Sequence, residues 1–363
     1  MTPRDRFIAV LDARVPDKTV WVSRLDIWYN ARKRNGTLPK QVAHLSLPET
    51  EDFLGMGRSA RDAEVFKVRY ENVQERTCGD ADHTTHKFIT PVGEVSCTYA
   101  HPESFRRDGT GRVLTKHYIE TLRDYDVMRY VAEHTRYQAT YEDYQQYDRR
   151  IGNAGYPLVV IPYSPIHKIM MSYVGYEQFY YHLADYPHKV HELLEAMEHN
   201  YRHMWQVLAA SPARFVLHGT HFSSQITPPP IFKKYFIPYF KQFNATMHEA
   251  GIKVTFHGDA DVSNLLELIL ECDFDMVDCF ATYPLVSCTF DQARQVWGDK
   301  IIIWGGVPST ILEPDYPFEQ FKAYMTDLFE KTVGRSHFIM AVSDNIMPGA
   351  ELDRLLWIKE LIG

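Results

Sequence analysis

Six short apolar runs, separated by amphipathic helical stretches, occupy the chain from about residue 157 onward. They are LVVIP at 158–162, RFVL at 214–217, KVTF at 253–256, MVDC at 276–279, IIIW at 301–304 and FIMAV at 338–342. This alternation is typical of parallel β/α units. Six runs in this part of the chain are too many for an open sheet with a separate partner domain. We therefore predict one (β/α)8 TIM barrel domain over residues 1–363.

The amino-terminal part of the chain has a different pattern. Residues 19–27 (TVWVSRLDI) are a plausible first strand of the barrel. Residues 65–98 show alternation and two turn sequences, CGDADH and TPVGEV, which predict an N-terminal β-hairpin insertion at the barrel edge. Residues 122–138 then return to the period of a helix.

One helix has clear ends and an aromatic stripe. Thr227 and the prolines at 228–230 predict its start, and Gly251 predicts its end. Apolar residues recur inside it at intervals of three or four: Phe232, Phe236, Phe240, Phe243 and Met247. Such a stripe is expected to pack on the barrel wall as core rather than to bind a cofactor.

The composition of the chain bears on its binding partners and on its cellular compartment. A net charge of −8 and a pI of about 6.1 favour neither nucleic acid nor an anionic membrane surface. Five cysteines without CxxC spacing suggest thiols in a reducing compartment. We find no run resembling a secretory signal, and none approaches the roughly 20 apolar residues of a membrane helix. We expect a cytoplasmic protein.

Ligating side chains follow several of the predicted strands. Because the loops after barrel strands converge on one mouth, these side chains are expected to lie together. Imidazole, thiolate and carboxylate are ligands of a borderline cation such as Zn²⁺. The residues concerned are His218, His221, His257, Asp259, Cys279 and Asp344.

We predict His221 and His257 as the principal metal ligands. Asp259 is a further ligand or a carboxylate that orients a histidine, and Cys279 is a weaker ligand candidate. His218 lies closer to its strand, where it could donate to a carbonyl or support the metal site; we group it with Asp344 as a candidate catalytic residue. The chain has no GxSxG, GxGxxG or GxxxxGK[ST] motif, so it lacks the fingerprints of α/β-hydrolases, dinucleotide-binding folds and P-loop enzymes.

Several segments resemble the uroporphyrinogen decarboxylase superfamily. They are PRDRFIAVLDARVPDKTV at the start, the TPVGEV turn, the long passage from PPPIFKKYF to DVSNLLELI, and KIIIWGGVPSTIL near the end. The resemblance extends over essentially the whole chain. It implies a (β/α)8 barrel, in agreement with the strand pattern.

The superfamily contains tetrapyrrole decarboxylases, which need no metal, and cobamide-dependent methyltransferases, which carry zinc. The PVWxMRQAGR motif of the decarboxylases is missing here, where residues 20–26 read VWVSRLD. The chain thus resembles the methyltransferases, particularly the O-demethylase type. Members of that group bind zinc through two glutamates and a histidine. His257 stands at the position of that histidine and His221 at the position of the first glutamate, but Phe236 occupies the position of the second glutamate. Thiol-methylating members use a cysteine two residues after the histidine, where Asp259 stands, so Asp259, Cys279 and Asp344 compete as third ligand.

The resemblance implies a zinc Lewis acid that acts on the heteroatom carrying a methyl group, with transfer to a corrinoid on a separate protein. The expected donor is a small molecule such as a methoxyarene, and homodimers are common in the superfamily. Four residues near the mouth could contact substrate: Asp26, Tyr29, Tyr163 and His167. Two alternatives stay open: a metal-independent decarboxylase or lyase using His and Asp as acid and base, and a non-catalytic member that retains only the fold.

Overall fold

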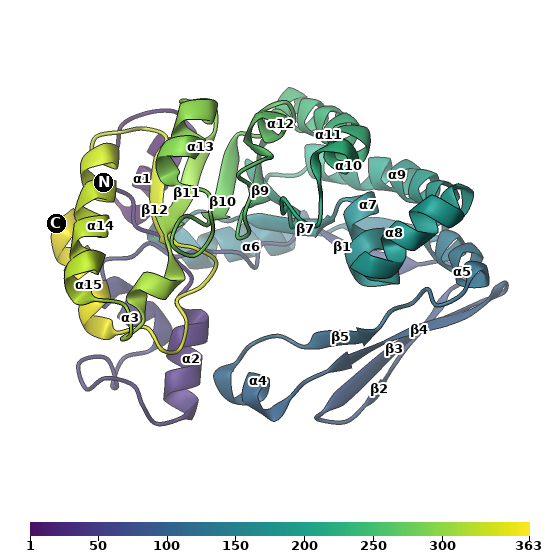
Figure 1. The fold of residues 1–363 in the computed structure, drawn as a ribbon, viewed down its shortest axis with the longest axis horizontal. Helices are drawn as coiled ribbons and strands as arrows, with labels where there is room; N and C mark the ends of the chain where they lie inside the picture. The colour runs from purple at the N-terminus through teal and green to yellow at the C-terminus, as the bar shows by residue number, and fades with distance from the viewer. The chain divides into compact units, whose positions relative to one another are not determined.

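The computed structural model describes residues 1–363 (Figure 1). The chain forms two compact units, each built from discontinuous segments. The first comprises Met1–Ala63, Gln145–Ile161 and Ala213–Gly363, and the second comprises Glu64–Tyr144 and Pro162–Pro212. That residues 1–363 act as one barrel domain stays a prediction.

A six-stranded parallel sheet dominates the first unit. Its order is β12-β11-β10-β9-β8-β7, so strands that follow one another in the chain are neighbours in the sheet. All six apolar runs are strands, as predicted: β7 Val159–Tyr163, β8 Phe215–Gly219, β9 Lys253–His257, β10 Met276–Phe280, β11 Ile302–Val307 and β12 Phe338–Val342. Helices follow the strands along the chain, which is the β/α order of the predicted TIM barrel (Figure 1).

Two short segments lie against the edges of this sheet. Trp21 forms a single bridge with Met340 of β12, and Ala63 forms one with Val159 of β7. The two segments meet each other where the Gly57 amide donates to the Trp21 carbonyl at 2.8 Å. Backbone contacts thus connect one edge of the sheet to the other, as the closed ring of a barrel requires.

The prediction of a strand over residues 19–27 is wrong in its extent. Only Trp21 lies in a bridge, with Val20 and Val22 exchanging backbone hydrogen bonds with Met340. Helix α2 already begins at Asp26 and runs to Arg34. An acidic first turn and a basic last turn stabilise this helix through its dipole, so the apolar run cannot continue as a strand.

An aromatic cluster fills the first unit toward the amino ends of the strands. Phe7, from helix α1 (Pro3–Leu11), packs against Tyr156, Phe215 and Trp304 with ring centroids 5.3 to 6.0 Å apart. All four residues are buried. This packing leaves the carboxyl ends of the strands as the place for polar side chains.

The helix with the aromatic stripe packs as predicted. It comprises α10 (Pro229–Ile231), a π-helical stretch at Phe232–Phe236 and α11 (Ile237–Glu249). All five stripe residues are fully buried. Gly251 adopts a left-handed φ of +73° just beyond the end, whereas the start differs from the prediction: Pro228 is the capping residue, and the Thr227 hydroxyl donates to the Ser223 carbonyl.

The second unit contains the predicted hairpins. Strands β2 (Gln74–Gly79), β3 (His83–Thr90), β4 (Gly93–Ala100) and β5 (Val113–Lys116) form an antiparallel sheet, and β1 (Phe66–Tyr70) pairs antiparallel with β6 (Thr135–Ala139). The predicted helix at 122–138 is α5 (Leu122–Glu133). It ends early because Thr135 and the residues after it pair with β1.

The remaining helices have the following bounds: α3 Leu47–Phe53, α4 Glu103–Asp108, α6 Tyr141–Ile151, α7 Pro165–Lys168, α8 Tyr176–Asp185, α9 Pro187–Ala209, α12 Leu266–Leu270, α13 Phe290–Trp297, α14 Phe318–Thr332 and α15 Leu352–Ile362. None of the helices is both long enough and apolar enough to span a bilayer.

The aromatic stripe gives a stability prediction. Phe240→Ala removes a fully buried ring that packs 4.8 Å from the Phe274 ring, so the free energy of unfolding should fall by about 3–5 kcal/mol. The exposed neighbour is the control: Lys241→Ala should change it by less than about 0.5 kcal/mol. Urea denaturation measures both, and equal effects would contradict the packing described here.

Candidate metal centre

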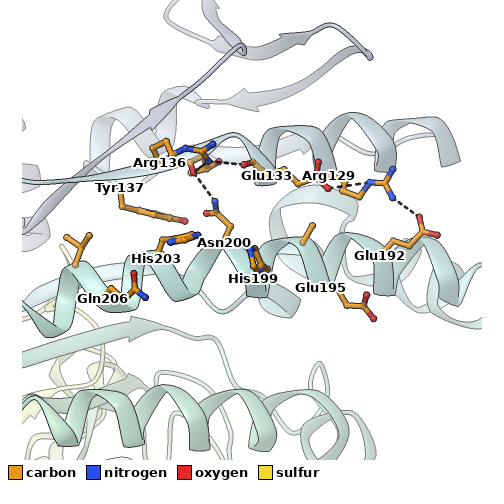
Figure 2. A pocket seen from close by; sticks show the side chains of 13 residues that line it. Arg129, Glu133, Arg136, Tyr137, Glu192, Glu195, His199, Asn200, His203 and Gln206 are labelled. Carbon is orange, nitrogen blue, oxygen red and sulfur yellow. Dashed lines mark hydrogen bonds and ion pairs between the residues drawn. The ribbon is translucent and has the colours of Figure 1, made fainter.

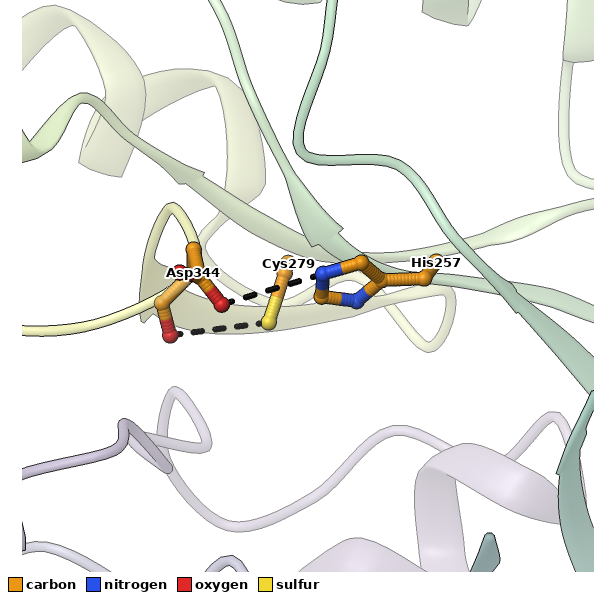
Figure 3. Close-up of side chains that lie close together, drawn as sticks. All are labelled: His257, Cys279 and Asp344. Carbon is orange, nitrogen blue, oxygen red and sulfur yellow. Dashed lines mark hydrogen bonds and ion pairs between the residues drawn. The ribbon is translucent and has the colours of Figure 1, made fainter. Parts of the chain in front are cut away.

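Three predicted site residues come together at the carboxyl ends of the strands (Figure 3). One ligating atom from each of His257, Cys279 and Asp344 lies within 4.8 Å of the others. His257 ends β9, Cys279 lies near the end of β10, and Asp344 follows β12 by two residues. The parallel order of the strands explains the convergence, because their carboxyl ends share one edge.

The two ring nitrogens of His257 have different surroundings. Nδ1 lies 3.0 Å from Oδ2 of Asp278, a carboxylate with no exposed surface. Nε2 faces two other carboxylates, at 3.7 Å from Asp344 Oδ1 and 3.4 Å from Asp259 Oδ2. Once Nε2 has lost its proton, as metal binding requires, the proton that Nδ1 donates to Asp278 leaves the Nε2 lone pair directed toward the cluster.

Asp278 is neutralised by Arg61, a residue that the sequence reasoning missed. The Arg61 guanidinium pairs with Asp278 Oδ1, and its Nη2 lies 3.6 Å from Cys279 Sγ. The cation also lies over the Trp304 ring, 5.2 Å from its centroid. Burial opposes ionisation of Asp278, but Arg61 and His257 together hold the pKa of this carboxyl well below its usual range.

The backbone of β10 explains how two consecutive residues reach the same site. In a regular strand, Asp278 and Cys279 would point to opposite faces. Here the pairing of β10 with β11 shifts register between Val277 and Phe280, and Cys279 adopts a left-handed φ of +56°. A β carbon on Gly305 would lie 2.4 Å from the Phe280 backbone nitrogen, so only glycine permits this close approach. The bulge turns both side chains toward Arg61 and His257.

His221 and Asp259 lie beside the three clustered residues. His221 Nδ1 is 3.3 Å from Asp259 Oδ1, while the other carboxylate oxygen faces His257. Burial raises the pKa of Asp259, but the two histidines outweigh it and lower the pKa of that carboxyl strongly. The structure therefore connects His221 to His257 through Asp259, with His221 outside the group of three.

Charge and strain are concentrated at the same place. Asp344 also adopts a left-handed φ, +57°, and its Oδ1 accepts from Arg24 Nη1 at 2.7 Å. Burial disfavours a charged His257, yet Cys279, Asp259 and Asp278 raise its pKa well above the usual value. Burial and the adjacent Asp278 raise the pKa of the Cys279 thiol. Non-glycine residues with positive φ each cost about 1–3 kcal/mol and cluster at functional sites.

His218 lies in the core, and its predicted catalytic role is not tested by its contacts. His218 is fully buried, and its Nε2 lies 2.9 Å from the Tyr239 hydroxyl. Its ring packs edge-on against Phe240 and Phe243, with centroids 5.1 and 4.7 Å away.

The four predicted substrate contacts lie in different surroundings. Tyr29 is buried and its hydroxyl donates to the Leu45 carbonyl at 2.6 Å, while Asp26 lies in the first turn of α2. In the second unit, Tyr163 ends β7 and its ring lies 5.9 Å from that of buried His167. The structure tests none of these four roles, which stay predictions.

The Arg61–Asp278 pair gives a second stability prediction. Asp278→Asn leaves a buried guanidinium without its counter-ion, so the free energy of unfolding should fall by about 3–5 kcal/mol. Arg24→Met breaks the half-exposed pair with Asp344 and should cost less than about 1 kcal/mol. Chemical denaturation compares the two, and equal losses would show that the buried pair contributes no more to stability than the half-exposed one.

Comparisons with known proteins agree with this architecture. The family described as uroporphyrinogen decarboxylase (URO-D) matches residues 105–362. A solved "methyltransferase from Methanosarcina mazei" shares the fold, with a TM-score of 0.58 and 14% identity over 99% of this chain and 98% of that one. The GH20 modules of a pneumococcal exo-β-D-N-acetylglucosaminidase reach a TM-score of only 0.31, at 10% identity over 61% of this chain and 62% of that one, too low to bear on the fold. No curated protein matches the sequence. Since the matched region exceeds half of its length, the chain belongs to the uroporphyrinogen decarboxylase family.

Proposed function

We propose that this protein is a zinc-dependent methyltransferase that moves a methyl group between a small substrate and a corrinoid protein. The observation that carries the proposal is the meeting of His257, Cys279 and Asp344 at the carboxyl ends of the strands. Nitrogen, sulfur and oxygen donors together suit zinc better than magnesium or calcium, which prefer oxygen alone.

The distances from His257 Nε2 to the neighbouring carboxylate oxygens agree with a zinc site. Zinc binds nitrogen and oxygen at about 2.0–2.2 Å and sulfur at about 2.3 Å, so tetrahedral ligand atoms lie about 3.3–3.8 Å apart. His257 Nε2 meets this spacing with Asp344 at 3.7 Å and with Asp259 at 3.4 Å. His257, Cys279 and Asp344 would hold the ion, with Asp259 as the alternative oxygen ligand. Three protein ligands are typical of catalytic sites, which keep a position for substrate.

The charges around the cluster also favour a dication. Asp278 and Arg61 neutralise each other, so they add no net charge beside His257. Ionised Cys279, Asp259 and Asp344 would carry three negative charges, of which Arg24 offsets one, so two would remain to balance a bound Zn²⁺. When bound, zinc would supply Lewis acidity to the heteroatom that carries the methyl group. Asp278 fixes the orientation of His257, and Arg61 holds Asp278 in its anionic form.

The fold supports methyl transfer as the reaction class. The Methanosarcina mazei protein with the same fold over nearly its whole length is called a methyltransferase. We propose a methoxyarene or a similar small molecule as donor and a corrinoid on a separate protein as acceptor. For an ether donor, the carbon–oxygen bond breaks with its electrons left on oxygen, and the methyl group passes to the corrinoid. A zinc ion bound at that oxygen would stabilise the charge, so little general acid catalysis would be needed.

A metal-independent decarboxylase or lyase is the second candidate. Arg24 and Arg61 lie beside the cluster, where guanidinium groups could hold substrate carboxylates. Both cations are already paired, however, with Asp344 and Asp278. A substrate would have to displace these carboxylates, so the arrangement favours the first candidate.

Metal content separates the two candidates. The purified protein should carry about one equivalent of zinc at the centre, and His257→Ala should lose it because the nitrogen ligand is removed. His44→Ala, in an exposed loop, is the matched control and should retain it. Elemental analysis measures the content. Unchanged turnover after EDTA treatment would instead favour the lyase.

Zinc binding should release protons. The raised pKa values of His257 and Cys279 keep both groups protonated near neutral pH without a metal, and both must lose a proton to ligate. We expect about two protons per ion and an affinity that rises with pH between roughly 6 and 8. Calorimetry in buffers of different ionisation enthalpy counts the protons. A binding enthalpy that is independent of the buffer would contradict this ligand set.

A further inference from the structure

We propose a second, surface site for a transition-metal dication on helix α9 in the second unit, formed by His199 and His203 with Glu195. The site lies in a groove of about 1010 Å³ bordered by α5, β6 and α9 (Figure 2). It involves none of the residues of the candidate metal centre and is independent of the proposed function.

Helical spacing puts the three side chains on one face of α9. Glu195, His199 and His203 are four residues apart, so each lies one turn from the next. The two imidazole centroids are 5.9 Å apart. Two histidines at this spacing are the same pair that the H-E-x-x-H motif uses to bind zinc from one helix.

Both arginines of the groove and its asparagine already have partners. Arg129 pairs with Glu192 at 3.3 Å and Arg136 with Glu71 at 2.8 Å. The Asn200 amide donates to the Thr135 carbonyl at 2.8 Å (Figure 2).

Three side chains in this groove that can ligate a transition metal make no hydrogen bond or ion pair. They are the carboxylate of Glu195 and the exposed rings of His199 and His203, which lie edge-on to each other. With both arginines paired, the unbalanced charge among these three groups is that of Glu195. The groove therefore suits a cation better than an anion.

Zinc, nickel and copper match this donor set. Imidazole nitrogens bind these dications, and a carboxylate supplies a third ligand. Two imidazole nitrogens that ligate one zinc ion lie about 3.3 Å apart. The Cβ atoms of two residues at this helical spacing lie about 5–6 Å apart, so the two rings must turn toward each other to bring their nitrogens to the distance that zinc requires. Because both histidines are exposed, rotation of their side chains can close this distance without moving the backbone. The bound ion would connect consecutive turns of α9 and keep positions open to water.

The test is zinc binding to the full-length protein by equilibrium dialysis. We expect wild type to bind a second, weaker ion besides the one at the candidate centre. His199→Ala and His203→Ala should each abolish the weaker ion and leave the tighter one. His188→Ala, exposed on the same helix, is the matched control and should retain both. Alanine at these exposed helical positions is not expected to disturb folding.

A spectroscopic measurement in the His257→Ala protein distinguishes this site from the proposed centre. Zinc should still shift the ring-proton NMR signals of His199 and His203, assigned by their loss in the single variants. If the candidate metal centre does not bind zinc but the surface site does, the wild-type protein binds only the weaker ion, and the NMR shifts of His199 and His203 persist. Rings that do not respond to zinc, or a weaker ion that survives both alanine variants, would overturn the surface site.

Discussion

The buried pair of Arg61 and Asp278 is the interaction on which the candidate centre depends. Asp278 has no exposed surface, and a lone carboxylate there would be strongly disfavoured. With Arg61 beside it, the carboxylate stays anionic and accepts the Nδ1 proton of His257. The opposite nitrogen then faces Cys279 and the carboxylates, so a buried salt bridge sets the direction of a candidate metal ligand.

Backbone irregularity at the strand ends completes the arrangement. Both Cys279 and Asp344 adopt left-handed backbone conformations, which residues other than glycine rarely adopt. At Cys279 this conformation accompanies a bulge, which Gly305 of the next strand accommodates. Regular strands would turn one of the adjacent residues 278 and 279 away from His257. These strained backbone conformations lower the stability of the fold at the place where the ligating atoms converge.

Much of this organisation could be predicted from the sequence. Apolar runs show the six strands of the main sheet, and polar residues at or just after their carboxyl ends indicate His257, Cys279 and Asp344 as neighbours. Arg61 escaped prediction because its segment makes only single bridges and has no strand pattern. The bulge in β10 leaves no mark in composition, so the shared orientation of Asp278 and Cys279 was also out of reach. His218 lies at the carboxyl end of a strand as His257 does, yet His218 is packed among phenylalanines and His257 faces acids, a difference that only tertiary contacts create.

The central claim is that His257, Cys279 and Asp344 share one zinc ion. Anomalous diffraction recorded on both sides of the zinc absorption edge, from crystals of the native protein, tests it most directly. The account predicts a zinc peak within bonding distance of His257 Nε2, Cys279 Sγ and an Asp344 carboxylate oxygen. A cluster that holds no zinc in protein purified without chelators, or a His257 ring turned away from Cys279, would contradict it.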